Sequence, residues 1–224
     1  MSFDARPPAR VVQEKEMENE DLLEMSVAQF IEATAAKTPT PGGGSVAGVV
    51  GALGSALARM ALNFTRGKKK YAEHEAFHAH LSERLCRARQ MFDQLVGDDI
   101  QAYKLYREAA AMEDGPQKQE AMELALAAAI DVPREATKLA LAVMDDLASL
   151  ADKCNPHLLS DLTAGAALSA AVVKLSDYNV CINTPQLADR RTARDIEEAS
   201  KTDLQRAQRC LQDIETATRN RKRN

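Results

Sequence analysis

Residues 42–66 read GGGSVAGVVGALGSALARMALNFTR and decide which class of fold the chain can adopt. From Val46 to Arg66 this stretch has the composition and spacing of a helix. Small residues recur along it every three or four positions and share one face: Gly44, Gly48, Gly51 and Ser55. Each glycine costs a helix roughly 0.5–1 kcal/mol relative to alanine, so only close packing against a second helix would stabilise this one. We expect it at the centre of a helical bundle.

The composition of the whole chain favours a single helical domain. The chain has 224 residues, of which 45% are hydrophobic and 28% charged, as in soluble globular proteins. Aromatic residues make up only 4%, and no segment of useful length alternates with a period of two, so the pattern of a sheet is missing. We predict an all-α, single-domain bundle of about six helices over residues 21–224, preceded by a flexible N-terminal tail over residues 1–20.

Proline and glycine divide the helical stretches. The run 38–41, with two prolines, Gly67, the Gly115–Pro116 pair and the connection 153–156 are the expected breaks. The expected helices cover residues 26–37, 46–66, 71–112, 117–151, 160–180 and 189–218, the first of them capped by Ser26. Kinks are expected at Gly97 and Pro133.

Charge and hydropathy limit the partners of the chain. Lys and Arg number 29 against 33 Asp and Glu, which gives a net charge of −4 and no basic footprint for nucleic acid. The most apolar run, residues 46–58, is shorter than the roughly 20 residues of a spanning helix. Residues 1–20 lack the apolar core of a signal peptide. We therefore expect a cytoplasmic protein that binds neither nucleic acid nor membrane.

The cysteines and histidines give no clear metal site. The four cysteines lie far apart without a CxxC pair, which argues against zinc and against a disulfide framework: Cys86, Cys154, Cys181 and Cys210. His74 and His78 are four residues apart and form either a metal-binding pair or two solvated histidines. No third ligand has suitable spacing, so we expect no metal.

The turn from Gly42 to Ser45 is a candidate ligand contact. Backbone N–H groups at the start of a helix have no partner within it, and glycine lets a ligand approach the backbone closely. The turn lacks the Gly-Lys-Ser/Thr of a phosphate loop. The alternative is a flexible turn that ends in a Ser45 cap. The basic run 66–70 after the helix is either a site for a carboxylate-bearing substrate tail or a solvated positive turn.

Asp99 is the candidate acid–base residue. It shares a helix face with Leu95, Ala102 and Tyr103, whereas the neighbouring Asp98 points about 100° away. A carboxylate on an apolar face is costly unless it is paired or functional, and burial would raise its pKa into a range that suits acid–base catalysis. The alternative is a carboxylate at the rim, held by a Lys or Arg.

Polar residues mark both ends of the expected helix over residues 160–180. Ser160 and Asp161 open it, and an N-cap pair explains them as well as a binding site does. Asn179 and Asn183 lie four residues apart and share a face if the helix continues. Their amides could read the donor and acceptor edge of a heterocycle, or they could simply end the helix.

These motifs, in this order, resemble the family of formiminotetrahydrofolate cyclodeaminases and methenyltetrahydrofolate cyclohydrolases. The motifs lie at residues 38–45, 63–71, 98–103, 160–161 and 179–183, within a resemblance that covers about residues 26 to 215. The resemblance implies an all-α homodimer with folate sites near the subunit interface. It also implies chemistry on the one-carbon unit that bridges, or is about to bridge, two nitrogens of tetrahydrofolate.

The resemblance also assigns roles to individual residues. The acid–base aspartate of the family matches Asp99, and Asp161 matches a second site carboxylate that binds the pterin or orients water. The substrate-binding positions match Pro41, Gly42, Gly43, Gly44, Ser45, Lys68, Tyr71, Asn155, Asn179 and Asn183. The chain departs from the family at Cys154 and His157, where Gly and Asn are usual, which bears on the local contacts and on the substrate.

The expected reaction is hydrolysis of 5,10-methenyltetrahydrofolate to 10-formyltetrahydrofolate, with Asp99 moving a proton from the attacking water to the departing nitrogen. No cofactor beyond the tetrahydrofolate substrate is expected. Two alternatives stay open: a formiminotetrahydrofolate cyclodeaminase that releases ammonia, and a helical assembly module without activity. The Lys-Lys-Lys-Tyr turn at residues 68–71 resembles the stand-alone cyclohydrolases and favours the first reaction.

Overall fold

The computed structural model describes residues 19–223, and all regular structure in this range is helical. The α-helices are α1 (Asn19–Glu24), α2 (Val27–Ala35), α3 (Gly43–Asn63), α4 (Glu75–Ala111), α5 (Pro116–Leu150), α6 (Leu159–Asn183) and α7 (Arg190–Arg223). Short 3-10 helices lie between them: η1 (Lys69–His74), η2 (Pro156–Leu158) and η3 (Thr184–Gln186). The all-α prediction is confirmed, with seven helices in the described range instead of about six. The extra helix is α1, whose first residues belong to the predicted tail; residues 1–18 of that tail lie outside the described residues.

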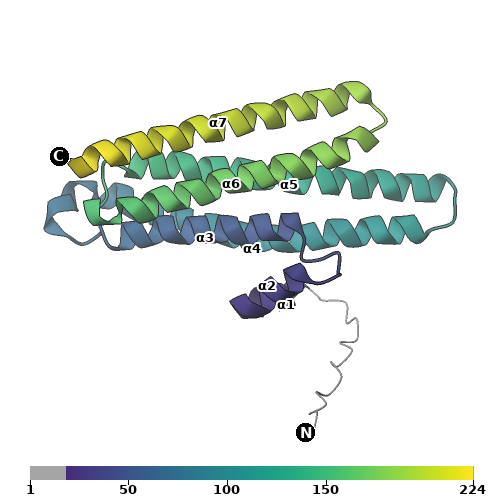
Figure 1. The fold of residues 1–224 in the computed structure, drawn as a ribbon, viewed down its shortest axis with the longest axis horizontal. Helices are drawn as coiled ribbons and strands as arrows, with labels where there is room; N and C mark the ends of the chain where they lie inside the picture. The colour runs from purple at the N-terminus through teal and green to yellow at the C-terminus, as the bar shows by residue number, and fades with distance from the viewer. Residues whose placement is uncertain (1–18, 224) are drawn as a thin grey trace, which may run out of the picture.

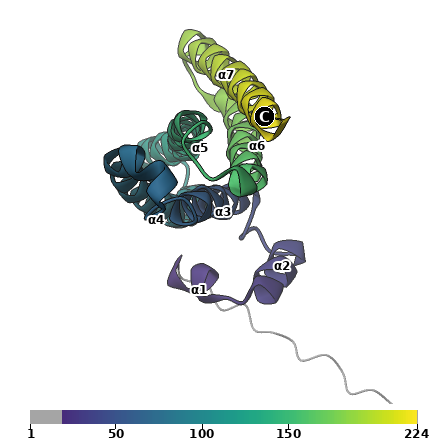
Figure 2. The same cartoon turned by 90° about the vertical axis from the view of Figure 1, so that its left-hand side faces the viewer.

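Helices α3 to α6 run up and down in an antiparallel bundle, and α7 lies along α6 and α5 on its outer side (Figure 1). The core consists of large side chains from α3 to α7, buried almost completely: Leu62, Leu81, Leu85, Phe92, Met144, Leu147, Leu150, Leu159, Leu162 and Ile214. The end-on view shows α1 and α2 outside the bundle, below α4, α3 and α6 (Figure 2). Leu22 anchors this arm in a small cluster with Val96 and Ile100 of α4. Ser26 caps α2 as predicted, with Gln29 completing a capping box.

The glycines of α3 allow two neighbouring helices to approach its backbone. A Cβ atom on Gly51 would lie 2.7 Å from Cγ of Phe92 in α4, and one on Gly48 would lie 2.6 Å from Cγ2 of Val96. On the α6 side, a Cβ on Gly54 would lie 3.1 Å from the carbonyl oxygen of Gly165. The predicted bare backbone face is confirmed: Gly48 and Gly51 of it face α4, and Gly54 beside it faces α6. The predicted position at the centre of the bundle is wrong, because α3 is one of four bundle helices and its outer side, with Leu53, is exposed.

Replacing Gly51 with alanine is expected to destabilise the protein by about 1–3 kcal/mol, because the new methyl would overlap the ring of Phe92, which has no exposed surface. Urea unfolding followed by circular dichroism measures this loss. Gly115→Ala is the matched control, since an added Cβ there has no neighbour within 4 Å and the unfolding midpoint should barely change. Equal midpoints for the two variants would contradict the packing described for α3.

The start of α3 differs from the prediction. The helix begins at Gly43 instead of Val46, with Gly42 as its N-cap and no side-chain cap hydrogen bond from that residue. Ser45 is therefore a fully buried residue of the first turn and not a cap, so the interpretation of this turn as ending in a Ser45 cap is wrong. At its other end α3 stops before Gly67, whose φ of 71° only glycine adopts readily.

Helices α3 and α6 are the most apolar part of the structure. By length and composition alone, α3 and the stretch Pro156–Gln186 that contains α6 could each span a membrane. In this structure 50% and 39% of their most apolar stretches are buried inside the bundle. They pack side by side, with α4 and α5 covering their inner sides (Figure 2). Large apolar side chains on or next to these two helices are more than half exposed, and we call this set the apolar face: Leu53, Phe64, Tyr178 and Ile182.

Candidate functional site

The first turn of α3 meets the middle of α4 at Asp99. The hydroxyl of Ser45 donates a hydrogen bond of 2.7 Å to Oδ2 of Asp99, and the backbone N–H of Ser45 also donates to this carboxylate. A Cβ on Gly44 would lie 2.5 Å from Cγ of Asp99, so only glycine leaves room for the carboxylate here. Asp99 therefore does what a capping side chain would do at position 42, and its charge lies at the positive end of the α3 dipole.

Burial sets the ionisation of this carboxylate. Removal from water raises the pKa of Asp99 above its ordinary value, while the hydrogen bonds from the hydroxyl and the backbone N–H of Ser45 oppose that shift. The described residues that line the pocket around it include no other carboxylate and no Lys, Arg or His. The prediction of an Asp99 carboxyl on a buried face, next to the glycine turn, is confirmed; the rim carboxylate held by a Lys or Arg is not what the structure shows.

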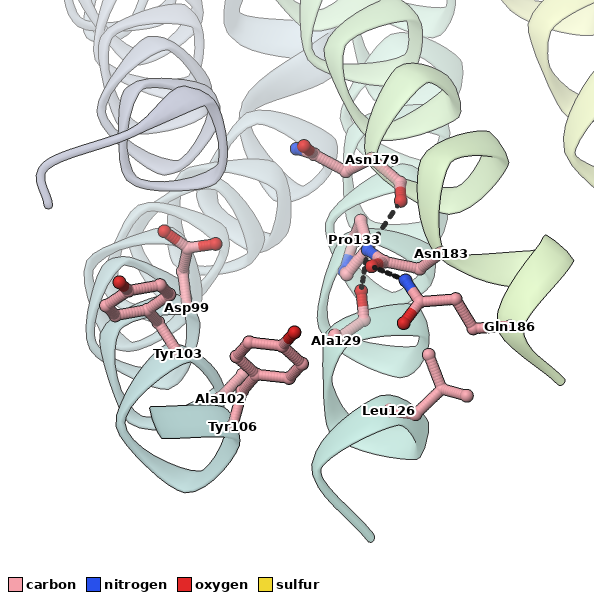
Figure 3. A pocket seen from close by; sticks show the side chains of 10 residues that line it. All are labelled: Asp99, Ala102, Tyr103, Tyr106, Leu126, Ala129, Pro133, Asn179, Asn183 and Gln186. Carbon is pink, nitrogen blue, oxygen red and sulfur yellow. Dashed lines mark hydrogen bonds between the residues drawn. The ribbon is translucent and has the colours of Figure 1, made fainter. Parts of the chain in front are cut away.

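A half-open pocket of about 280 Å³ leads from this carboxylate to the middle of α5 and the end of α6 (Figure 3). Helix α4 supplies one wall, α5 the floor, and the end of α6 with η3 the opposite wall: Asp99, Ala102, Tyr103, Tyr106, Leu126, Ala129, Pro133, Asn179, Asn183 and Gln186. The pocket combines one carboxylate, two phenols and three amides with an apolar lining. Such a combination suits a flat, polar-edged ring system.

The side-chain amides of Asn179 and Asn183 in α6 differ in their hydrogen bonds. Asn183 donates from Nδ2 to the carbonyl of Asn179 at 2.8 Å and lies 3.4 Å from the carbonyl of Ala129. The carbonyl of Ala129 accepts no hydrogen bond within α5, because the residue four positions later is Pro133, which has no backbone N–H. The side-chain amide of Asn179 has no hydrogen bond within residues 19–223 and points into the space opposite Asp99 (Figure 3). Asn179 is therefore available to a ligand, and Asn183 ties α6 to α5.

The remaining predicted site residues lie at the other end of the bundle. Asp161 is in the first turn of α6, eighteen residues before Asn179, which puts the two about 27 Å apart along the helix. The backbone N–H of Asn155 donates to Oγ1 of Thr65 at 2.9 Å, just after α3 ends. Lys68 and Tyr71 lie in the segment that follows. One chain therefore does not bring these four residues to the Asp99 pocket, and their place in one site with Asp99 stays a prediction. We call them the far-end cluster.

Two members of the far-end cluster, Asn155 and Tyr71, pack against or hydrogen-bond the rest of the bundle. The side chain of Asn155 donates to the carbonyl of Phe64 at 3.4 Å and accepts from the N–H of His157, so it joins the end of α3 to η2. Tyr71 is buried. Of the two departures from the family pattern, Cys154 is buried near Arg221 of α7 and His157 is exposed.

Comparisons with known proteins show the family and the fold to which the chain is similar. The model of the formiminotransferase-cyclodeaminase family matches residues 26–202. The chain belongs to this family. Methenyltetrahydrofolate cyclohydrolase from Methylorubrum extorquens is 31% identical over 75% of this chain and 83% of its own length. Formimidoyltransferase-cyclodeaminase from Dictyostelium discoideum is 29% identical over 95% of this chain, which spans only 40% of that protein. The crystal structure of formiminotetrahydrofolate cyclodeaminase from Thermotoga maritima superposes with a TM-score of 0.81 at 29% identity, covering 88% of this chain and 98% of that one.

Sequence reasoning missed several residues of the pocket in this family member. Tyr106 of α4 and Gln186 of η3 line it, and so do Leu126 and Pro133 of α5. Tyr106 lies seven residues after Asp99 and so on the same helix face, a signal that could have found it. The sequence carries no comparable signal for Leu126 and Pro133, because only the packing of α5 against α4 brings these residues to the pocket.

The family member has no cluster of metal ligands in the part described. No three His, Cys, Asp or Glu side chains within residues 19–223 come together as a metal site would require. Of the histidine pair, His78 is buried with Nε2 3.0 Å from the carbonyl of Lys153, and His74 packs edge-on against it. Desolvation lowers the pKa of His78, which keeps this ring neutral. His78 helps to hold the turn after α5, so the interpretation as solvated histidines is wrong for His78, whereas His74 is partly exposed.

Proposed function

We propose that the chain hydrolyses 5,10-methenyltetrahydrofolate to 10-formyltetrahydrofolate, with Asp99 as the acid–base residue. The observation that carries the proposal is the half-buried carboxylate of Asp99, held at the start of α3 by Ser45 and open to a pocket of suitable size. The cyclohydrolase from Methylorubrum extorquens supports the choice of reaction, since the two chains match over most of their lengths.

The proposed mechanism uses the electrophilic character of the substrate. The methenyl carbon lies in a positively charged amidinium, so the protein needs to supply a positioned water and a group that moves its proton. Asp99 accepts one proton of the water as its oxygen bonds to the methenyl carbon, and returns it to the ring nitrogen whose bond to that carbon breaks. The remaining hydroxyl proton passes to solvent as the formyl C=O forms, so the cationic substrate gives a neutral product and one proton. The carboxylate charge also favours a cationic substrate. Asn179 is placed to bind the edge of the pterin, opposite Asp99 (Figure 3).

Cyclodeamination of formiminotetrahydrofolate is the second candidate. It is favoured by the Thermotoga maritima cyclodeaminase, whose structure matches nearly the whole length of both chains. In that reaction the ring closes on the formimino carbon and ammonia leaves, and Asp99 in its protonated form would supply the proton to the departing nitrogen. The raised pKa of Asp99 suits both directions of proton transfer.

Absorbance measurements with each substrate test the proposal. The purified chain is given 5,10-methenyltetrahydrofolate and, separately, formiminotetrahydrofolate, in buffer containing EDTA because we propose no metal or further cofactor. Loss of the methenyl chromophore supports the cyclohydrolase, and its appearance supports the cyclodeaminase. No change with either substrate would leave the helical assembly module and overturn the proposed enzyme.

We further propose that the working protein is a homodimer formed through the apolar face. The glycine turn with Asp99 lies at one end of α3, and the far-end cluster lies at the other. Two copies that meet through the apolar face with antiparallel long helices place the Asp99 pocket of one beside the far-end cluster of the other. Asp161, Lys68, Tyr71 and Asn155 then reach the folate from the second copy. The lysine lies where the glutamate tail of the folate extends, and we place the dimer in the cytoplasm.

Replacing Leu53 with glutamate is expected to dissociate this dimer and to lower turnover at least tenfold, because a charge would enter an apolar interface and separate the two clusters. Analytical ultracentrifugation and the absorbance assay measure the two effects. Leu124→Glu is the matched control, since Leu124 is an exposed leucine of α5 outside the apolar face. A dimer that survives Leu53→Glu, or an active monomer, would refute this interface.

A further inference from the structure

A second, very small cavity lies on the inner side of Asp99. Its volume is about 10 Å³, close to the minimum that holds one water molecule. All four bundle helices line it, with Gly48 of α3, Leu95 of α4, Ala136 of α5 and Ser176 of α6 among its lining residues. The carboxyl of Asp99 and the residue Asn179 line this cavity and the large pocket alike.

Within residues 19–223 the hydroxyl of Ser176 has no hydrogen-bond partner, although the residue has no exposed surface. Other buried serines of the bundle behave differently. Ser169, two turns earlier on α6, donates 2.9 Å to the carbonyl of Gly165, and Ser55 of α3 donates 3.0 Å to that of Gly51. A buried hydroxyl without a partner is destabilising, so the structure calls for an acceptor or donor in the cavity beside it.

Few titratable side chains lie close enough to change the pKa of Asp99. Neither cavity is lined by a titratable residue of α3, α5 or α6, and the phenols of Tyr103 and Tyr106 on α4 are the only other titratable groups lining the large pocket in the described chain. Besides Ser45, the groups able to hydrogen-bond Asp99 from the inner side are Ser176 and Asn179.

We propose that Ser176 and Asp99 together bind one buried water in this cavity, and that Ser176, through this water, is a positioning residue for the carboxylate. The hydroxyl of Ser176 donates to the water, and the water donates to Asp99. The water thereby gives Asp99 a donor in addition to the two from Ser45 and favours its ionised form. The effect on turnover rests on the proposed function, whereas the water site and its effect on ionisation do not.

Titration of the purified full-length chain tests the proposal, with Asp99 observed by carbon NMR of labelled aspartate and assigned by comparison with Asp99→Asn. Ser176→Ala is expected to raise the pKa of Asp99 by about one unit, because the ionised carboxylate loses a donor. The acid limb of the kcat profile for folate turnover should move to higher pH by the same amount, with little change in KM. Ser176→Val, which fills the cavity with methyl groups, should give an equal or larger shift.

Ser169→Ala is the matched control, since it removes a buried serine hydroxyl from the same helix but leaves the cavity unchanged. It should change stability without moving the pKa of Asp99. A high-resolution crystal structure should show a water within hydrogen-bond distance of both Ser176 Oγ and the Asp99 carboxyl. An unmoved pKa in folded Ser176→Ala, or a dry cavity in that crystal structure, would overturn the proposal. A wild-type chain inactive on both folates overturns the proposed function alone, because the NMR titration needs no substrate.

Discussion

Asparagine in place of Asp99 is expected to lower the rate of folate turnover by about 10²–10⁴-fold while the bundle stays folded. The amide keeps the shape of the side chain and can still accept from the hydroxyl and the backbone N–H of Ser45. It cannot take a proton from water or return one to a departing nitrogen. Single-turnover absorbance measurements report the loss, and equilibrium binding of a folate analogue should change much less than the rate.

The same substitution should leave stability equal or higher at neutral pH. Because burial raises the pKa of Asp99 in the folded chain, the favourable contribution of its protonated form is lost as the pH rises through that pKa. Asparagine has no charge to desolvate, so thermal unfolding of the variant should occur at the wild-type temperature or above it near pH 7. This advantage should shrink in acid, where the wild-type carboxyl is neutral.

Asp98→Asn is the matched control for this prediction. Asp98 is the preceding residue of α4 and is exposed, so it shares the sequence context of Asp99 without its surroundings. Its replacement should leave turnover unchanged and the bundle folded. An Asp99→Asn variant with full activity would remove the acid–base role, and one that fails to fold would show that the carboxylate holds α3 in place.

The face of Asp99 could be predicted because helical periodicity is local. Its neighbours three and four residues away are apolar, and the 3.6-residue repeat then places the carboxyl toward the core without knowledge of the partner helix. The start of α3 could not be predicted in this way. Glycines at 43 and 44 argue against helix when read alone, and the group that stabilises the first turn comes from Asp99, 54 residues away in the sequence.

For the far-end cluster, the distance from Asp99 could be predicted from the sequence, but a shared site could not. Asp161 and Asn179 belong to one predicted helix, and a rise of 1.5 Å per residue already separates them by about 27 Å. The family resemblance assigned both to one site, and helix geometry alone was enough to show that one chain could not unite them. The apolar face had an early signal too: the helix has few charges all round, so it stays apolar on the outer side that neither α4 nor α6 covers.

Gly44→Ala is expected to lower turnover by about 10²–10³-fold with only a modest loss of stability, an effect nearly as large as that of replacing the acid–base residue itself. A methyl at position 44 would lie 2.5 Å from Cγ of Asp99 and closer still to Oδ1. The obstacle is the end of a short side chain that can rotate toward the large pocket, so the helix need not move. The rotated carboxylate loses the hydrogen bond from Ser45 and its place beside the reacting carbon.

A double variant can show whether Gly44→Ala lowers turnover by displacing the Asp99 carboxylate or by disturbing α3. In an Asp99→Ala background the added methyl meets no carboxylate, so Gly44→Ala should cause no further loss of turnover there, and the two substitutions should be strongly non-additive. Gly43→Ala, whose Cβ would lie 3.9 Å from the amide oxygen of Asn179, should preserve the unfolding temperature and the Ser45 hydrogen bond to Asp99. Additive losses in the double variant would mean that the methyl acts on α3 and not on Asp99.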